Sequence, residues 1–222
     1  DFWNGYSVKD IDPEYLYTEP GEYILTATAT EDNFASCQAS KSIPILVREL
    51  PNPEIEPLEA DSCSPYVYKP KINGDVSYAI DYEDSGIIEA NESHTYVNKG
   101  LEPIIYKTSI YLEDEYGCKS VKQGLVNVYP EPVASIAIVE VLEERPEVVT
   151  FASTSYGADV CRWTFPFAGK LETCKEVKES FYENKTETIY LEVANMYGCV
   201  DNDSIDYTPV FKGLYFPNTF SP

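Results

Sequence analysis

Residues that carry chemistry are scarce in this sequence. The 222-residue chain has one methionine and one histidine, His94. A Ser-His-Asp or Cys-His centre would depend on that histidine alone, and the six cysteines lack the close paired spacing of zinc sites. Acidic groups such as Asp81 with Asp84, or residues 113–115, are of the type that glycosidases use, but they fall among turn signals and are typical of solvated turns. We therefore expect no enzymatic activity, no cofactor and no metal site.

Positive charge and long apolar runs are scarce as well. The chain has 16 Lys and Arg against 38 Asp and Glu, a formal net charge of −22. Such a surface repels phosphate backbones and anionic membranes. No apolar stretch reaches the roughly 18 residues that a membrane helix needs, and no signal peptide is recognisable. We expect neither nucleic-acid binding nor membrane insertion, and we interpret the acidity as a source of solubility, with a divalent-cation requirement as the alternative.

The chain does contain a regular spacing of cysteines. Cys37, Cys118 and Cys199 stand at equal intervals of 81 residues (118 − 37 and 199 − 118), each after an alternating apolar run. Proline-containing connectors follow at 50–53, 129–132 and 208–209, and they indicate short, semi-rigid joints. The spacing predicts three units of roughly 80 residues at 1–50, 53–130 and 133–210, the first of them incomplete.

Within each expected unit the pattern is that of β-strands. Residues 23–30, 106–112 and 188–193 are short runs rich in β-branched and aromatic side chains, bounded by Gly, Asn, Asp and Pro. No window has the apolar stripe of an amphipathic helix. With 19 Tyr and 9 Phe to fill small two-sheet cores, the sequence predicts an all-β chain of tandem immunoglobulin-like sandwiches.

Several motifs resemble a known repeat family. Residues 1–5 read Asp-Phe-Trp-Asn-Gly, residues 12–17 read Asp-Pro-Glu-Tyr-Leu-Tyr, and residues 20–23 read Pro-Gly-Glu-Tyr. Together they resemble the signature of polycystic-kidney-disease (PKD) repeats, with degenerate copies around Asp81-Tyr82 and Trp163-Thr164-Phe165. The resemblance implies PKD-like sandwiches, and it puts His94 at a structural position of the His-x-Tyr motif.

The last ten residues resemble a second family. Residues 213–222, Gly-Leu-Tyr-Phe-Pro-Asn-Thr-Phe-Ser-Pro, are similar to the opening of the gliding-motility-associated C-terminal domain. That resemblance implies a sorting signal of the type IX secretion system and export to a bacterial cell surface. The expected partners are the secretion machinery, through the downstream domain, and the neighbouring repeats.

The cysteines fit an exported protein with disulfides. The 55-residue separation of Cys63 and Cys118 (118 − 63) can link the start of a sandwich to the end of its penultimate strand, and we expect that bond. Cys161 and Cys174 flank an expected hairpin turn and could bridge across it. A Cys161–Cys199 bond is the alternative. The partners of Cys37 and Cys199 stay open.

Three kinds of function remain compatible with these observations. We favour a structural or adhesive stalk segment of a large surface protein. The alternatives are a glycan- or protein-binding module that uses exposed aromatics, and an accessory region of a secreted hydrolase. The candidate binding aromatics are Trp3, Tyr6, Tyr15 and Phe34.

Short modification motifs are also present. Asp203-Ser204-Ile205 matches the O-glycosylation pattern of bacteria with a type IX system, so Ser204 is a candidate acceptor. Asn-x-Ser/Thr sequons begin at residues 91, 184 and 202.

Overall fold

A computed structural model describes residues 7–209 except 11, 32–33, 90–92 and 143–144. The described residues form 18 β-strands and no helix, so the predicted all-β class is confirmed. Among these residues, no helix is long and apolar enough to span a membrane.

The chain divides into two compact units. Unit 1 comprises the described parts of Asp1–Glu56, Lys71–Ala90 and Ser109–Gln123, and unit 2 those of Pro57–Pro70, Asn91–Thr108 and Gly124–Pro222. The strands β10 (Ile104–Glu113) and β11 (Lys119–Tyr129) each contribute residues to both units.

Unit 1 begins with a long hairpin of β1 (Gly21–Glu31) and β2 (Phe34–Val47). The strands pair antiparallel from Gly21 opposite Val47, and hydroxyl pairs such as Thr26 with Ser42 (2.9 Å) line one face. Short strands follow: β3 (Glu54–Glu56) pairs with β6 (Lys71–Asn73), and β7 (Ser77–Asp81) lies between β8 (Ile87–Glu89) and β10.

The first segments of unit 2 are β4 (Ala60–Cys63), β5 (Tyr66–Tyr68) and β9 (His94–Tyr96). The last four residues of β11 pair with β4 in parallel, which makes β4 the edge of a sheet of order β4-β11-β10-β7-β8. The rings of Tyr68 and Tyr96 are fully buried, and each hydroxyl has a partner: Tyr68 donates to the Pro57 carbonyl (2.9 Å), and Tyr96 lies 3.2 Å from the Thr108 hydroxyl. These partners remove the free-energy cost of burying an unpaired tyrosine hydroxyl.

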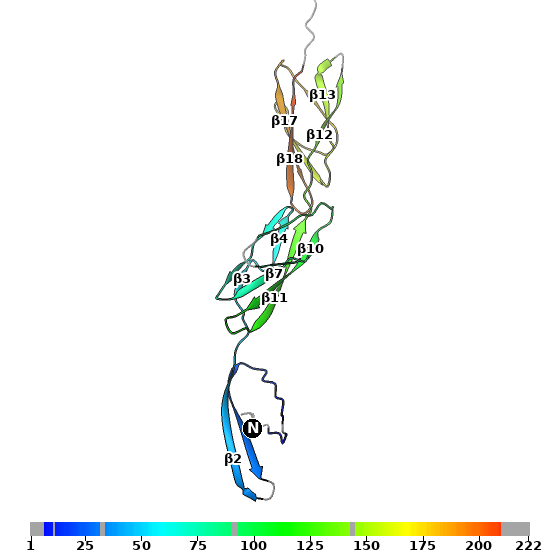
Figure 1. The fold of residues 1–222 in the computed structure, drawn as a ribbon. Coiled ribbons are helices and arrows are strands. Elements are labelled where there is room, and N and C mark those ends of the chain that lie inside the picture. Colours follow the sequence, from blue (N-terminus) through cyan, green and yellow to red (C-terminus); the bar gives the residue numbers. More distant parts are fainter. Residues whose placement is uncertain (1–6, 11, 32–33, 90–92, 143–144, 210–222) are drawn as a thin grey trace, which may run out of the picture. The chain divides into compact units, whose positions relative to one another are not determined.

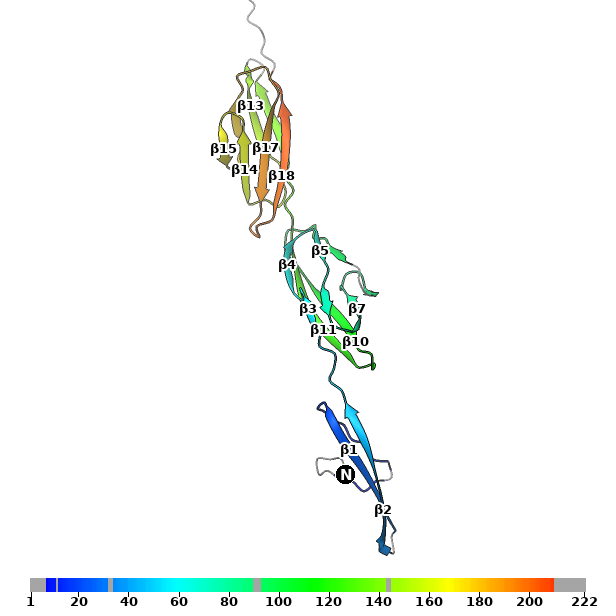
Figure 2. The ribbon, with the colours of Figure 1, turned by 90° about the vertical axis from the view of Figure 1, so that its left-hand side faces the viewer.

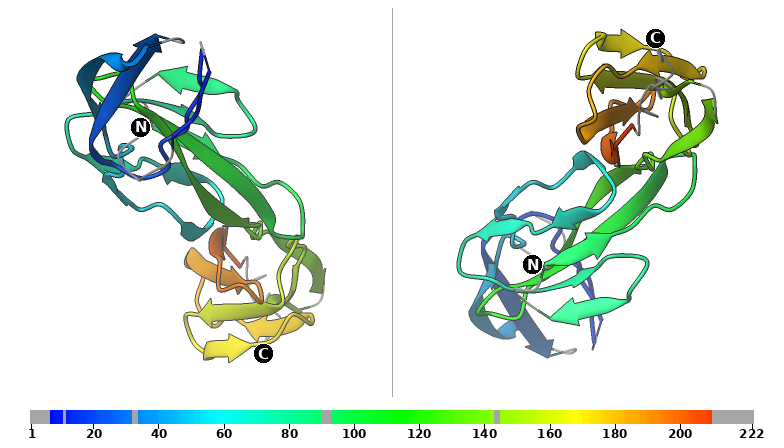
Figure 3. Two further views of the ribbon diagram at one scale, coloured as in Figure 1. Left: turned by 90° about the horizontal axis from the view of Figure 1, so that it is seen from below. Right: turned by 90° about the horizontal axis from the view of Figure 1, so that it is seen from above.

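The remainder of unit 2 is a two-layer sandwich. Its strands are β12 (Ile136–Leu142), β13 (Arg145–Ser153), β14 (Val160–Phe165), β15 (Gly169–Glu172), β16 (Val177–Ser180), β17 (Glu187–Ala194) and β18 (Val200–Tyr207). One sheet has the order β12-β13-β16 and the other β15-β14-β17-β18. Figure 1 shows the two sheets as layers, Figure 2 looks onto the four-stranded one, and Figure 3 gives views from below and from above.

Strict alternation of buried and exposed residues builds this sandwich. Along β14, Cys161, Trp163 and Phe165 point inward and the residues between them point outward, as the period of two in a strand requires. Trp163 is fully buried, stacks on Phe165, and donates its indole N–H to the Thr173 carbonyl (3.0 Å). Burial of side chains of this size contributes about 1.5–3 kcal/mol each, so this core stabilises the last sandwich.

Candidate functional site

The most distinctive structure outside the cores is a five-residue turn that occurs twice. Asp114 begins the first copy, before β11. Its Oδ1 accepts the N–H groups of Tyr116 and Cys118, both at 2.9 Å, while its own N–H donates to the Cys118 carbonyl (3.1 Å). Gly117 has φ +80°, a left-handed conformation that glycine adopts without strain.

The second copy begins at Asn195, before β18. The Asn195 Oδ1 accepts the N–H groups of Tyr197 (3.1 Å) and Cys199 (3.0 Å), and its N–H donates to the Cys199 carbonyl (3.0 Å). Gly198 has φ +84°. The two turns therefore share their hydrogen bonds and their Tyr-Gly-Cys sequence, and their residues lie 81 positions apart.

In each copy the turn tyrosine packs against the connector that precedes the sandwich. In unit 1 the guanidinium carbon of Arg48 lies 3.4 Å from the centroid of the Tyr116 ring, a cation–π contact. Two residues of β11 then bind the same connector: Ser120 donates to the Pro51 carbonyl, and Lys122 Nζ donates to the Pro53 carbonyl (2.6 Å). A hydrogen bond with Glu115 raises the pKa of Tyr116, and Arg48 acts against it. We call these contacts the 48–53 joint.

In unit 2 the equivalent contacts form the 129–136 joint. Tyr197 stacks on Tyr129 with the ring centroids 5.2 Å apart and 12° between the planes. The Asn195 amide donates to the Pro130 carbonyl (2.7 Å). On β18, the carboxylates of Asp201 and Asp203 accept the N–H groups of residues 134 (2.8 Å) and 136 (2.9 Å). Desolvation raises the pKa of Tyr197, with the Glu102 carboxylate as the next cause.

A disulfide crosslinks the second joint. It joins Cys63, the last residue of β4, to Cys199 in the turn before β18. Cys63 is paired with Tyr129 in the parallel ladder, and the Ser64 N–H donates to the Tyr129 carbonyl (2.9 Å). The bond therefore attaches the turn to the strand beside the connector, next to the stacked tyrosines.

This bond corrects the expected pairing of Cys63 with Cys118, which is wrong in the structure: Cys118 is a free thiol. Cys118 precedes the first residue of β11, whereas Cys63 lies beside the last residue of that strand. Eleven strand residues span roughly 30–35 Å, and a disulfide requires Cα atoms within about 7 Å.

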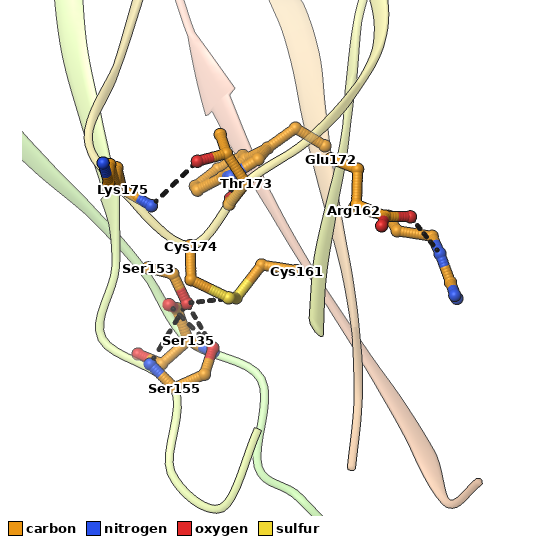
Figure 4. The surroundings of a disulfide bond; sticks show 10 residues. Ser135, Ser153, Ser155, Cys161, Arg162, Glu172, Thr173, Cys174 and Lys175 are labelled. Atoms are coloured by element: carbon orange, nitrogen blue, oxygen red, sulfur yellow. Dashed lines mark hydrogen bonds and ion pairs between the residues drawn. A yellow bond between two sulfur atoms is a disulfide. The ribbon is translucent and has the colours of Figure 1, made fainter. Parts of the chain in front are cut away.

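The second disulfide lies inside the last sandwich and joins Cys161 to Cys174. Figure 4 shows it beside Ser153, whose hydroxyl lies 3.8 Å from the Cys161 sulfur. The Thr173 N–H donates to the Cys161 carbonyl (2.9 Å), which fixes the loop after β15 against β14. This is the first of the two pairings that the sequence left open; the Cys161–Cys199 alternative is replaced by the Cys63–Cys199 bond.

The other sequence candidates lie apart from the joints. Ser204 is exposed on β18, and its N–H donates to Asp203 Oδ1 (2.8 Å). His94 packs edge-on against Tyr96 with centroids 4.5 Å apart. Tyr15 is half-buried. Trp3, Tyr6, the 1–5 motif and segment 213–222 lie outside the described residues, as does the side chain of Phe34.

The acidic groups considered from sequence have structural contacts. Asp81 Oδ1 accepts the Glu83 N–H (2.9 Å), Asp114 organises its turn, and Glu113 pairs with Lys119 at 3.2 Å. Within the described part of the chain, no three His, Cys, Asp or Glu side chains are grouped so that they could hold a metal ion.

Comparisons with known proteins do not identify a family. No family model and no curated protein sequence matches the chain. Among solved structures, the human desmocollin-1 ectodomain is 10% identical with a TM-score of 0.29, and the match covers 84% of this chain and 44% of that ectodomain chain. Fibronectin(III)-like modules of Clostridium thermocellum CbhA are 11% identical with a TM-score of 0.33, covering 71% and 93%. A Ca²⁺-stabilised adhesin of an Antarctic bacterium is 8% identical with a TM-score of 0.30, covering 85% and 56%.

These likenesses are too distant to support an argument about function. The chain spans less than two thirds of the desmocollin-1 and adhesin structures. The immunoglobulin-like assignment rests on the strand pairing described above. The two disulfides are typical of proteins outside the cytosol.

Proposed function

We propose that this chain is a non-enzymatic stalk segment of a bacterial cell-surface protein, built from tandem PKD-like sandwiches and exported by the type IX secretion system. The observation that supports the stalk most directly is the repeated joint. In both copies the hairpin turn of a sandwich packs against the connector that enters it, and in one copy a disulfide adds to that contact.

The joint contacts suit a load-bearing role because they remove the freedom of the connector. A free connector of five or six residues would let its neighbours reorient. In the 129–136 joint, three hydrogen bonds to backbone groups, one ring stack and one disulfide restrict it. Such a set of contacts would let the joint transmit tension along a surface fibre.

The tandem repeat is the second part of the proposal. The matching turns, Asp114–Cys118 and Asn195–Cys199, and the matching connector contacts are both offset by 81 residues, as expected if one unit had been duplicated. The PKD assignment and the domain boundaries at 1–50, 53–130, 133–210 and 213–222 remain part of this proposal and rest on the sequence motifs.

Backbone ¹⁵N relaxation of the oxidised chain tests the stalk directly. We compare the rotational correlation time of the amides in β14 and β17 with that of the amides in β5 and β9, across the 129–136 joint. A stiff joint gives one shared correlation time. In the variant with Cys63→Ala and Cys199→Ala, the last sandwich should gain independent motion and a shorter correlation time.

The matched control is the variant with Cys161→Ala and Cys174→Ala, which removes a disulfide without touching the joint and should keep the shared value. Two different correlation times in the oxidised wild-type chain would contradict the stalk function.

The secretion route has its own test. Residues 133–222 are fused to a periplasmic reporter, with and without the sequence that follows residue 222 in the parent gene, in a host with a type IX system. Surface delivery should require the following sequence. Delivery without it would remove the secretion part of the proposal and leave the stalk.

A further inference from the structure

The outer face of the four-stranded sheet β15-β14-β17-β18 carries two ion pairs and an exposed tyrosine. Figure 2 looks onto this sheet. The inward side is the apolar core, whereas the outward side carries polar and charged groups around a single exposed ring. We call it the Tyr190 face. Its defining residues are Arg162, Lys170, Glu172, Tyr190, Glu192 and Asn202.

The strand register arranges these side chains in two rows. Arg162 is opposite Glu172 on one side and Glu192 on the other, and Glu192 is opposite Asn202, so one row crosses all four strands. A second row lies two residues away along each strand, and in it Thr164 stands between Lys170 and Tyr190. Since residues i and i+2 of a strand share a face, both rows lie on one surface.

Two carboxylates hold the Arg162 guanidinium in place. Arg162 Nε is 3.2 Å from Glu172 Oε2, and Nη1 is 2.9 Å from Glu192 Oε1. The pKa of Arg162 is raised, with the Glu192 hydrogen bond as the largest cause. The guanidinium is therefore a fixed, planar donor group. With Lys170, two positive charges accompany the two carboxylates of these rows, and Asp206 in the next row on the same side of β18 adds a third negative charge. This face is therefore close to neutral in a chain of net charge −22.

Other groups on this face have unused binding capacity. The side chain of Tyr190 is 55% exposed. Among the residues that the structure describes, none hydrogen-bonds the side chains of Lys170, Tyr190 or Asn202. The rows border a shallow depression of about 380 Å³, at the small end of the volumes found for ligand sites.

We propose that the Tyr190 face binds a neutral oligosaccharide of gluco-configured pyranoses. A ring with equatorial hydroxyls has two apolar C–H faces, which stack on an exposed tyrosine, and a polar edge, which hydrogen-bonds to fixed amide, guanidinium and carboxylate groups. This near balance of charge favours an uncharged ligand, because the acidic chain repels polyanions and the Arg and Lys side chains oppose a cation. This site is independent of the stalk function.

Alternative occupants fit the Tyr190 face less well. A protein interface would need several aromatic or aliphatic anchors at its centre. This face offers one ring at its centre, and the exposed aliphatic residues Leu171 and Val200 lie on its edge strands β15 and β18. A second copy of the chain would bring its own net charge of −22 toward this one, which opposes association.

Isothermal titration of the full 222-residue chain with cellohexaose and laminarihexaose tests the proposal, with hexagalacturonate as the anionic probe. We expect binding of at least one neutral probe and weaker binding of the anionic one. Tyr190→Ala should weaken binding about tenfold, and Tyr190→Phe should retain it because stacking needs only the ring. Asn202→Ala should weaken binding without altering the core.

The matched control is Tyr156→Ala, since Tyr156 is also 55% exposed and lies outside this face. It should bind as the wild type does. Thermal unfolding of each variant checks that the sandwich remains intact. The proposal is overturned if no neutral probe binds at millimolar concentration, if Tyr190→Ala binds normally, or if sedimentation shows that Tyr190→Ala abolishes self-association instead.

Discussion

The Cys63–Cys199 bond should contribute more to stability than the bond inside the core. Its cysteines are 136 residues apart in sequence, and those of the Cys161–Cys174 bond are 13 apart. In the chain-entropy model these separations correspond to about 5 and about 3 kcal/mol respectively. Removal of each bond by a double change to alanine should show that order, since each variant truncates one buried cysteine, Cys199 or Cys161.

The stabilisation expected from the Cys63–Cys199 bond changes little if the last sandwich unfolds alone. Cys63 then stays attached beside Tyr129, and the closed loop has the 70 residues from Tyr129 to Cys199 (199 − 129). A loop of that length still corresponds to about 4 kcal/mol. The expected loss for the Cys63→Ala, Cys199→Ala variant is therefore about 4–5 kcal/mol under either unfolding scheme.

Unfolding in guanidinium chloride, monitored by tryptophan fluorescence, measures this loss. Trp163 is buried in the last sandwich, and a Trp3→Phe background makes it the sole indole. Cys37→Ser and Cys118→Ser in all samples prevent exchange with free thiols. A loss below about 2 kcal/mol, or a loss smaller than that of the Cys161→Ala, Cys174→Ala variant, would refute the chain-entropy reasoning.

Other predictions follow from single residues. Burial raises the pKa of Glu179 above its ordinary 4.5, so stability is lost as pH rises through the folded-state pKa; Glu179→Gln should have the higher melting temperature at pH 7, and the difference should vanish at pH 3. Gly198→Ala forces φ +84° on a side chain and should cost about 1–2 kcal/mol in chemical denaturation. Gly124→Ala should cost more than Gly198→Ala, because its Cβ would collide with the Leu58 carbonyl. Thiol titration of the native oxidised chain should find two free cysteines, with the exposed Cys37 reacting before Cys118. An intact mass equal to the polypeptide mass would show that Ser204 and the Asn sequons are unmodified.

The alternation of apolar and polar residues was enough to predict strands and the all-β class. Runs such as 188–193 carry their inward and outward residues in the sequence itself, since the period of two fixes which side chains share a face. The Cys161–Cys174 pairing could also be predicted, because both residues flank one local turn.

The Cys63–Cys199 bond could not be predicted from the sequence, for a physical reason. Pairing from spacing assumes that a bond closes within one unit, and the parallel alignment of β4 with the end of β11 places Cys63 at the connector instead. Parallel pairing depends on a long-range register that no local signal records. The Tyr190 face was missed similarly, because Arg162, Glu172 and Glu192 meet only through the register of three strands.

The turn residues show why function is better sought in the joints and faces than in the cores. A core residue such as Ile189 needs only to be apolar and of suitable size. The Tyr-Gly-Cys turn requires three particular residues for three different reasons: a ring to stack on the connector, a left-handed glycine, and a sulfur to reach another strand. In the 48–53 joint, Arg48 stands 81 positions before Tyr129 and contacts the turn tyrosine in its place. The ring contact there is a cation–π contact, and the turn cysteine, Cys118, forms no disulfide. The same turn therefore forms one joint that reduction would loosen and one that it would leave unchanged, and a relaxation measurement with and without reductant separates the two.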